Sequence, residues 1–278
     1  MNNFIYHNPT KLVFGKGQIA RLPKLIPAGK RIMLTFGGGS VKRNGVYDQV
    51  VAALEGRDLV EFWGIEANPS VETLREAIAL GKERKVDFLL AVGGGSVIDS
   101  CKAIAYGLAE PEHDVWELYA GQRKAKACFP VASVLTIAAA GSEMSNSCVI
   151  TNTDTEEKRA YDDDLARPKF AIMDPELTMT LPDYQTEAGC ADIMMHTMER
   201  YFVNSGTMEL TDALAEGLLR TVMHNAEVLH TDPRNYDARA EVMWASSLAH
   251  NGLTGCGSDG GDWMPHLLEH EMGGMFNV

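Results

Sequence analysis

The sequence has no Cys-x-x-Cys pair, and its five cysteines are an odd number spread along 278 residues. This pattern disfavours both a disulfide framework and a zinc site built from thiolates. We therefore expect free thiols, as in proteins of the reducing cytoplasm, and we predict a cytoplasmic location.

Clusters of positive charge and long apolar runs are also missing. Lys and Arg number 25 against 38 acidic residues, which gives a formal net charge of −13. An acidic chain without a Lys/Arg-rich run is unsuited to nucleic acid or to an anionic membrane surface, so neither is expected as a partner. No run approaches the roughly 20 apolar residues that span a bilayer, and the N-terminus lacks the pattern of a secretion signal. We expect a small-molecule partner instead.

The order of apolar patterns along the chain predicts the fold. A hydrophobic share of 45% and a charged share of 23% are typical of a globular protein with a buried core. The predicted strands are 31–36, 60–65, 86–92 and 131–137, and the predicted helices include 46–56, 71–85 with Ser70 as its N-cap, 211–230 and 237–250. Strands that alternate with helices indicate βαβ units and a parallel sheet. We predict an α/β domain over residues 1–182 and an all-α domain over residues 183–278.

Two glycine-rich turns follow predicted strands. They are residues 36–40, Phe-Gly-Gly-Gly-Ser, and residues 92–96, Val-Gly-Gly-Gly-Ser, the second of which opens directly into a helix. Glycine lets the backbone approach phosphates, and a helix N-terminus favours their negative charge. Neither turn is G-x-G-x-x-G or a Walker loop, so either one by itself is equally well explained as a tight turn without a ligand. Two such turns at the carboxyl ends of strands in one sheet favour a dinucleotide site.

The first turn also bears on the choice of cofactor. NAD sites usually place a carboxylate on the ribose 2′-hydroxyl, and this carboxylate repels a 2′-phosphate. Residues 37–40 contain no acid, whereas Ser40, Lys42 and Arg43 offer a hydroxyl and two positive charges. We therefore predict that NADP(H) is preferred over NAD(H).

One Asp/His pair and one His/His pair at helical spacing indicate a metal site. Asp192 and His196 are four residues apart, and His266 and His270 repeat this spacing on a second predicted helix, which Asp262 would cap. A carboxylate with imidazoles suits a divalent metal such as Fe²⁺ or Zn²⁺. Each pair alone is also compatible with surface or core histidines, and the second is not the H-E-x-x-H of zincin proteases.

With these residues identified, the sequence resembles the iron-containing (group III) alcohol dehydrogenase family, specifically its butanol dehydrogenase and broad aldehyde reductase branch. The motifs that carry the resemblance run through almost the whole chain, at residues 8–17, 36–50, 91–105, 135–146, 174–177, 189–202 and 265–277.

The resemblance implies an N-terminal dinucleotide-binding α/β domain, an all-α C-terminal domain, and a metal in the cleft between them. It makes Asp192, His196 and His266 the metal ligands and gives His270 a catalytic role in proton relay. Together with the glycine turns, it assigns to the cofactor Gly38, Gly39, Ser40, Gly94, Gly95, Ser96, Asp99, Thr136, Ser142 and Lys158. Among these, Gly39, Ser40 and Lys158 are expected near the adenosine ribose and its 2′-phosphate.

Two departures from the family pattern matter. Ala140 stands where many relatives have threonine, which affects an expected cofactor contact. Relatives continue past the Met-Phe-Asn-Val ending into a Thr-His-Gly segment whose histidine is the fourth ligand, so we expect the helical domain to be truncated at Val278. We expect a chain of this length to be poorly active and prone to aggregation. A homodimer is also compatible with the resemblance.

The function expected on this basis is metal-dependent hydride transfer between NADP(H) and a primary alcohol or aldehyde, with aldehyde reduction favoured in cells. One alternative is a dehydroquinate synthase-like lyase of similar architecture. Its phosphate-bearing substrate calls for basic residues near the metal, where residues 186–202 offer chiefly Arg200. The other alternative is an inactive nucleotide-binding fragment, which would bind NADPH but hold no metal.

Overall fold

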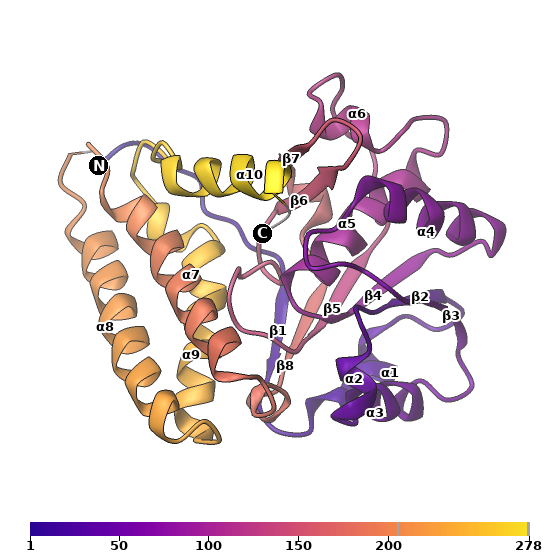
Figure 1. The fold of residues 1–278 in the computed structure, drawn as a ribbon, viewed down its shortest axis with the longest axis horizontal. Helices are drawn as coiled ribbons and strands as arrows, with labels where there is room; N and C mark the ends of the chain where they lie inside the picture. The colour runs from indigo at the N-terminus through magenta and orange to yellow at the C-terminus, as the bar shows by residue number, and fades with distance from the viewer. Residues whose placement is uncertain (205, 277–278) are drawn as a thin grey trace.

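The computed structural model describes residues 1–204 and 206–276, so that Asn277 and Val278, at the end of the last family motif, lie outside the described part. Figure 1 shows a sheet flanked by helices and, beside it, a group of longer helices. The predicted class, an α/β part followed by a helical part, is confirmed. In the described ranges, no helix combines the length and the apolar character needed to cross a membrane.

The main sheet has six strands, all parallel, in the order β1-β8-β5-β4-β2-β3. Their bounds are β1 (Lys11–Phe14), β2 (Arg31–Thr35), β3 (Asp58–Phe62), β4 (Phe88–Gly93), β5 (Val131–Leu135) and β8 (Phe170–Met173). The four predicted strands are confirmed, with shifted ends. The largest shift is in β3, which ends before Gly64, whose φ of 96° lies outside the extended region.

The helices predicted from periodicity are present, with shifted ends, whereas three helices of four residues were not predicted. Their bounds are α1 (Leu22–Leu25), α2 (Ser40–Arg43), α3 (Val46–Ala53), α4 (Val71–Glu83), α5 (Gly95–Ala109), α6 (Trp116–Tyr119), α7 (Asp183–Tyr201), α8 (Glu209–Thr231), α9 (Tyr236–His250) and α10 (Met264–Phe276). Short 3₁₀ turns lie at η1 (Gln18–Arg21), η2 (Asp164–Ala166), η3 (Pro175–Thr178) and η4 (Leu253–Gly255). Ser70 caps α4 as predicted, because its hydroxyl accepts the Thr73 N–H at 3.3 Å.

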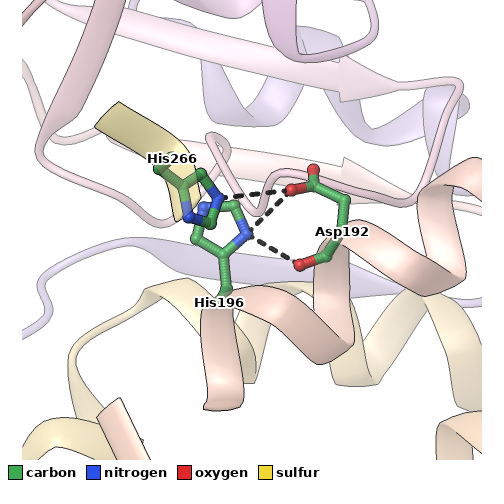
Figure 2. Close-up of side chains that lie close together, drawn as sticks. All are labelled: Asp192, His196 and His266. Atoms are coloured by element: carbon green, nitrogen blue, oxygen red, sulfur yellow. Dashed lines mark hydrogen bonds and ion pairs between the residues drawn. The ribbon is translucent and has the colours of Figure 1, made fainter. Parts of the chain in front are cut away.

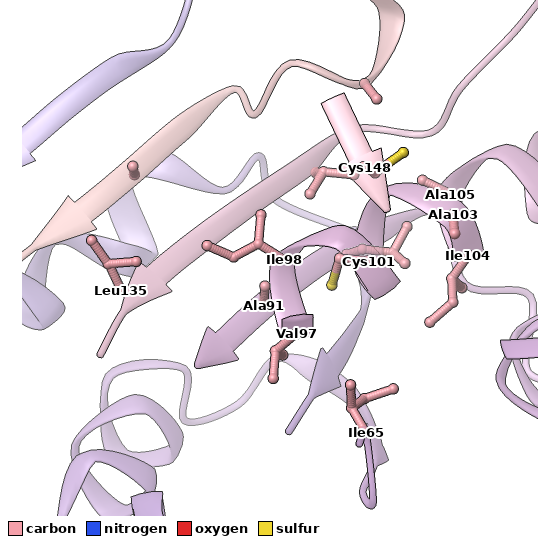
Figure 3. Packing of buried hydrophobic residues seen from close by; sticks show 14 of the residues in the cluster. Ile65, Ala91, Val97, Ile98, Cys101, Ala103, Ile104, Ala105, Leu135 and Cys148 are labelled. Atoms are coloured by element: carbon pink, nitrogen blue, oxygen red, sulfur yellow. The ribbon is translucent and has the colours of Figure 1, made fainter. Parts of the chain in front are cut away.

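Strand β4 shows why the sheet needs helices on both faces. Leu90 and Val92 belong to the apolar cluster that contains α3 residues, whereas Leu89 and Ala91 belong to the cluster that contains α4 and α5 residues. All six residues of β4 are buried, as expected for a central parallel strand. In Figure 3, Val97, Ile98 and Cys101 of α5 lie around Ala91, in one apolar cluster with it. This packing holds α5 against the sheet, and its first turn directly follows the carboxyl end of β4.

A second, two-stranded sheet was not predicted. Strands β6 (Ser147–Asn152) and β7 (Glu157–Asp162) form an antiparallel hairpin, and α10 lies beside β7 (Figure 1). Helices α7, α8 and α9 pack against one another. The predicted boundary at residue 182 falls between η3 and α7, and the division into two domains stays a prediction.

Candidate functional site

One face of α7 and the first turns of α10 bring three possible metal ligands together. Asp192 and His196 lie one turn apart on α7, and His266 reaches them from α10 (Figure 2). Donor atoms of the three residues all lie within 4.8 Å of one another. Asp192 Oδ1 is 3.1 Å from His196 Nδ1 and 3.6 Å from His266 Nε2. Among the described residues, this is the one group of at least three such side chains close enough to share an ion.

Contacts within this cluster stabilise the charged forms of Asp192 and His266. Burial disfavours the Asp192 carboxylate, but its contacts with His196 and His266 outweigh this effect and lower the pKa of Asp192 well below its usual range. Burial also disfavours a charged His266, yet Asp192 and Glu199 more than compensate and raise the pKa of this imidazole. An anionic ligand beside two imidazoles suits a divalent first-row metal.

Glu199 orients His266, and sequence reasoning missed it. Its side chain is buried, and Oε1 accepts the His266 backbone N–H at 3.2 Å and contacts the ring Nδ1. Because a carboxylate in this role accepts, the proton sits on Nδ1, and Nε2 would be left free to bind a metal. The available signal was spacing: Glu199 follows Asp192 by seven residues and His196 by three, which places all three on one face of α7.

His250 on α9 is a second residue that the sequence did not single out. Its ring centroid lies 4.3 Å from that of His196, and its Nδ1 is 2.7 Å from the Ala140 carbonyl oxygen. Burial lowers the pKa of His250 well below its ordinary value, so the ring is neutral near pH 7. His250 therefore links His196 to the loop that contains Ala140, the position where the family pattern is broken.

A cleft of about 620 Å³ joins these residues to the second glycine turn. Of the residues assigned to the cofactor, those that line it are Gly95, Ser96, Asp99, Ser142 and Lys158. The metal-type residues and His270 line the same cleft. One continuous space therefore runs from the N-terminus of α5, which suits phosphate, to the metal-type cluster.

The remaining assigned residues lie outside the cleft lining. Gly38, Gly39 and Ser40 follow β2, the neighbour of β4 in the sheet, and Gly94 and Thr136 are next to cleft residues in the chain. The two glycine turns lie close together, because a Cβ on Gly37 would be 3.7 Å from Val97 Cγ2.

Lys158 was expected near Gly39 and Ser40, but of the three only Lys158 lines the cleft. Its ammonium is 3.2 Å from Asn68 Oδ1 and 2.5 Å from Glu269 Oε1 of α10. Lys158 therefore lies at the α10 side of the cleft. Its ion-pair partner, Glu269, directly precedes His270 in the chain. Its assignment to the 2′-phosphate stays a prediction.

Comparison with known proteins identifies the family. The model of the iron-containing alcohol dehydrogenase family matches residues 9–175, and that of the C-terminal part of the Fe-containing alcohol dehydrogenase family matches residues 186–278. The chain belongs to the iron-containing alcohol dehydrogenase family.

Individual members are similar over the whole chain. The NADPH-dependent aldehyde reductase YqhD of Escherichia coli is 46% identical over 280 residues, which cover 100% of this chain and 72% of that protein. The probable NADH-dependent butanol dehydrogenase 1 of Bacillus subtilis is 44% identical over 281 residues, with the same coverage. The crystal structure of NADH-dependent butanol dehydrogenase A from Thermotoga maritima superposes with a TM-score of 0.97 at 41% identity, covering 100% of this chain and 70% of that one.

Membership of this family confirms several expectations. The chain is an alcohol and aldehyde oxidoreductase that acts on small molecules, and the family implies a divalent metal and a nicotinamide cofactor. The lyase alternative gains no support, since both family models describe alcohol dehydrogenases. The donor chemistry of Asp192, His196 and His266 fits the implied metal, and the glycine turn before α5 fits a pyrophosphate.

Proposed function

We propose that this chain reduces aldehydes to primary alcohols with NADPH, with Asp192, His196 and His266 holding Fe²⁺ or Zn²⁺. The observation that carries the proposal is that this cluster and the N-terminus of α5 line one cleft. When bound, the metal supplies a Lewis acid for the carbonyl oxygen and the nicotinamide supplies hydride.

Individual residues have distinct roles in this proposal. The N–H groups of Gly95 and Ser96, at the start of the 15-residue helix α5, bind the pyrophosphate. Glu199 keeps His266 in the tautomer that presents Nε2 to the metal. His270, one turn beyond His266, delivers the proton that the alcohol oxygen needs. Burial lowers the pKa of His270, so the ring is neutral near pH 7 and would relay the proton, accepting one at one ring nitrogen and releasing one from the other.

The preference for NADPH over NADH rests on the turn after β2. Gly39 has a φ of 90°, and a Cβ there would meet no heavy atom within 4 Å. The space beside the turn is therefore open to a phosphate. Lys42 Nζ lies 3.9 Å above the Trp63 ring, which holds a positive charge next to the turn.

The direct test is oxidation of NADPH with butyraldehyde by the purified chain, with and without added Fe²⁺ or Zn²⁺. We expect slow but metal-dependent turnover and a kcat/KM for NADPH at least about tenfold above that for NADH. In Ser40→Asp, at the exposed first residue of α2, the new carboxylate should repel the 2′-phosphate and reduce this ratio, whereas NADH turnover persists. Metal-free binding of NADPH without any turnover would favour the inactive fragment. Equal use of the two cofactors would contradict the stated preference alone.

We also propose that the chain forms a homodimer in the cytoplasm. The support is an apolar groove beside the open edge of β1, lined by Leu12, Phe14, Ala240, Glu241 and Trp244. Phe14 and Trp244 are 40% and 41% exposed, although both are large apolar side chains. The cytoplasmic location is supported by the five cysteines, which are all free thiols.

Light scattering should give a molar mass twice that of one chain. Phe14→Lys should lower the molar mass to that of a single chain, because a charge would be buried at the two-fold contact. Tyr184→Lys, at an exposed position at the start of α7, is the matched control and should leave the dimer intact. A monomeric wild-type chain would refute the dimer without affecting the catalytic proposal.

A further inference from the structure

Lys102 is a buried lysine for which the proposed mechanism has no use. It lies on α5, and its side chain has no exposed surface. Its ammonium is within hydrogen-bond distance of four oxygens, all in the segment between β5 and the start of β6. They are Ser142 O at 2.8 Å, Ser142 Oγ at 2.9 Å, Ser145 O at 3.1 Å and Ser147 O at 2.6 Å.

Burying a lysine without partners is costly, so this arrangement requires compensation. Burial lowers the pKa of Lys102, and Asp99, whose Oδ1 is 4.0 Å from the ammonium, opposes this effect. A charged ammonium has three protons to donate and a neutral amine has only two. Four converging oxygens therefore favour the charged form, and the contacts are of the strong, charge-assisted kind.

The segment held by Lys102 forms one wall of the cleft. Ser142, Ser145 and Ser147 all line it, and residues 142–146 contain only turns and bends. Ser142 and Ser145 belong to no strand, and their carbonyl groups converge on one ammonium together with that of Ser147, the first residue of β6. Asp99 adds to the same effect, because it accepts the Ser142 hydroxyl at 2.5 Å and the Val149 N–H at 3.0 Å.

Helix α5 therefore acts on two sides of the cleft. Its first turn, at Gly95 and Ser96, faces the cleft directly. One and two turns later, Asp99 and Lys102 form hydrogen bonds with segment 142–147. The distance between the phosphate end of the cleft and the 142–147 wall is thus set by a single rigid helix.

We propose that Lys102 is a positioning residue, whose ammonium holds segment 142–147 in the conformation that receives the nicotinamide cofactor. This inference rests on the proposed binding of NADPH in the cleft. Lys102 does not contact the cofactor; it acts through the backbone of the three serines.

The test replaces Lys102 with methionine, which has a similar length but no proton to donate. Because buried carbonyl oxygens would lose their donor, we expect the Kd and KM for NADPH to rise about tenfold or more. At saturating NADPH, kcat should remain within about threefold of wild type, since the metal site is untouched. Amide hydrogen exchange without cofactor should accelerate in residues 142–149 and stay unchanged in α8.

Lys82→Met is the matched control, because Lys82 donates to the Pro111 carbonyl oxygen at 2.9 Å on an exposed part of α4. It should leave both the Kd for NADPH and the exchange pattern unchanged. If Lys102→Met does not fold, Lys102→Gln serves instead, because its amide still donates two protons and a partial effect of the same kind is expected.

Two results for Lys102→Met would overturn the proposal. In the first, both the Kd for NADPH and the amide hydrogen exchange of residues 142–149 are unchanged. In the second, amide hydrogen exchange is faster throughout the chain and the Kd for NADPH is unchanged. The second would make Lys102 a stability residue only. A wild-type chain that binds no NADPH would refute the proposed function. Exchange measured without cofactor would then still decide whether Lys102 fixes this segment.

Discussion

Asp192→Ala is expected to lose the metal and to lower kcat/KM for aldehyde reduction by about a thousandfold or more, since metal polarisation contributes several kcal/mol to the barrier. Asp192 is the anionic member of the cluster, and its Oδ1 lies between the two imidazoles. Without it, only the two imidazoles of the set remain, and they hold a divalent cation less tightly than a set with a carboxylate.

The loss of metal is measured by elemental analysis after dialysis against buffer with trace Zn²⁺ or Fe²⁺. Asp183→Ala, at an exposed position in the first turn of the same helix, controls for the loss of a carboxylate from α7. It should retain the metal and the activity. Full metal content and normal turnover in Asp192→Ala would remove Asp192 from the ligand set and the proposed chemistry with it.

The parts of the fold that local pattern encodes were predicted from the sequence. Strand β4 is a run of buried apolar residues, and α4 has a cap and an apolar stripe, so both were recognised. Strand β1 and the β6–β7 hairpin were missed. Strand β1 is only four residues long with one buried position, and β7 has no buried residue at all. Their pairing depends on partners distant in sequence.

The site was predicted in the same uneven way. Spacing on a single helix suggested Asp192 with His196, and a second pair suggested His266; the structure brings these three together. Glu199, His250 and Lys102 are different, because their roles depend on contacts between elements far apart in the chain. A lysine on a predicted helix usually faces solvent, so only the folded chain shows that Lys102 points inward.

The contact between the cleft loop and α9 depends on Gly141, and Gly141→Ala should lower the free energy of unfolding by about 2–4 kcal/mol. The φ of Gly141 is +64°, which disfavours a side chain, and an added Cβ would lie 2.5 Å from the Ser246 carbonyl oxygen and 2.8 Å from His250 Cβ. Since both neighbours belong to α9, the loop or the helix must move. The melting temperature should fall by about 5–10 °C.

Gly217→Ala is the control with the opposite sign. Gly217 lies inside α8, and a Cβ there would meet no heavy atom within 4 Å. Alanine at an open helix position should stabilise the chain by up to about 1 kcal/mol, because it restricts the unfolded backbone and favours the helix. If both substitutions raise the melting temperature, the loop does not approach α9 as closely as described. If only Gly141→Ala lowers it, and the KM for NADPH rises as well, the same contact that stabilises the fold also shapes the cleft, through Ala140 and its bond to His250.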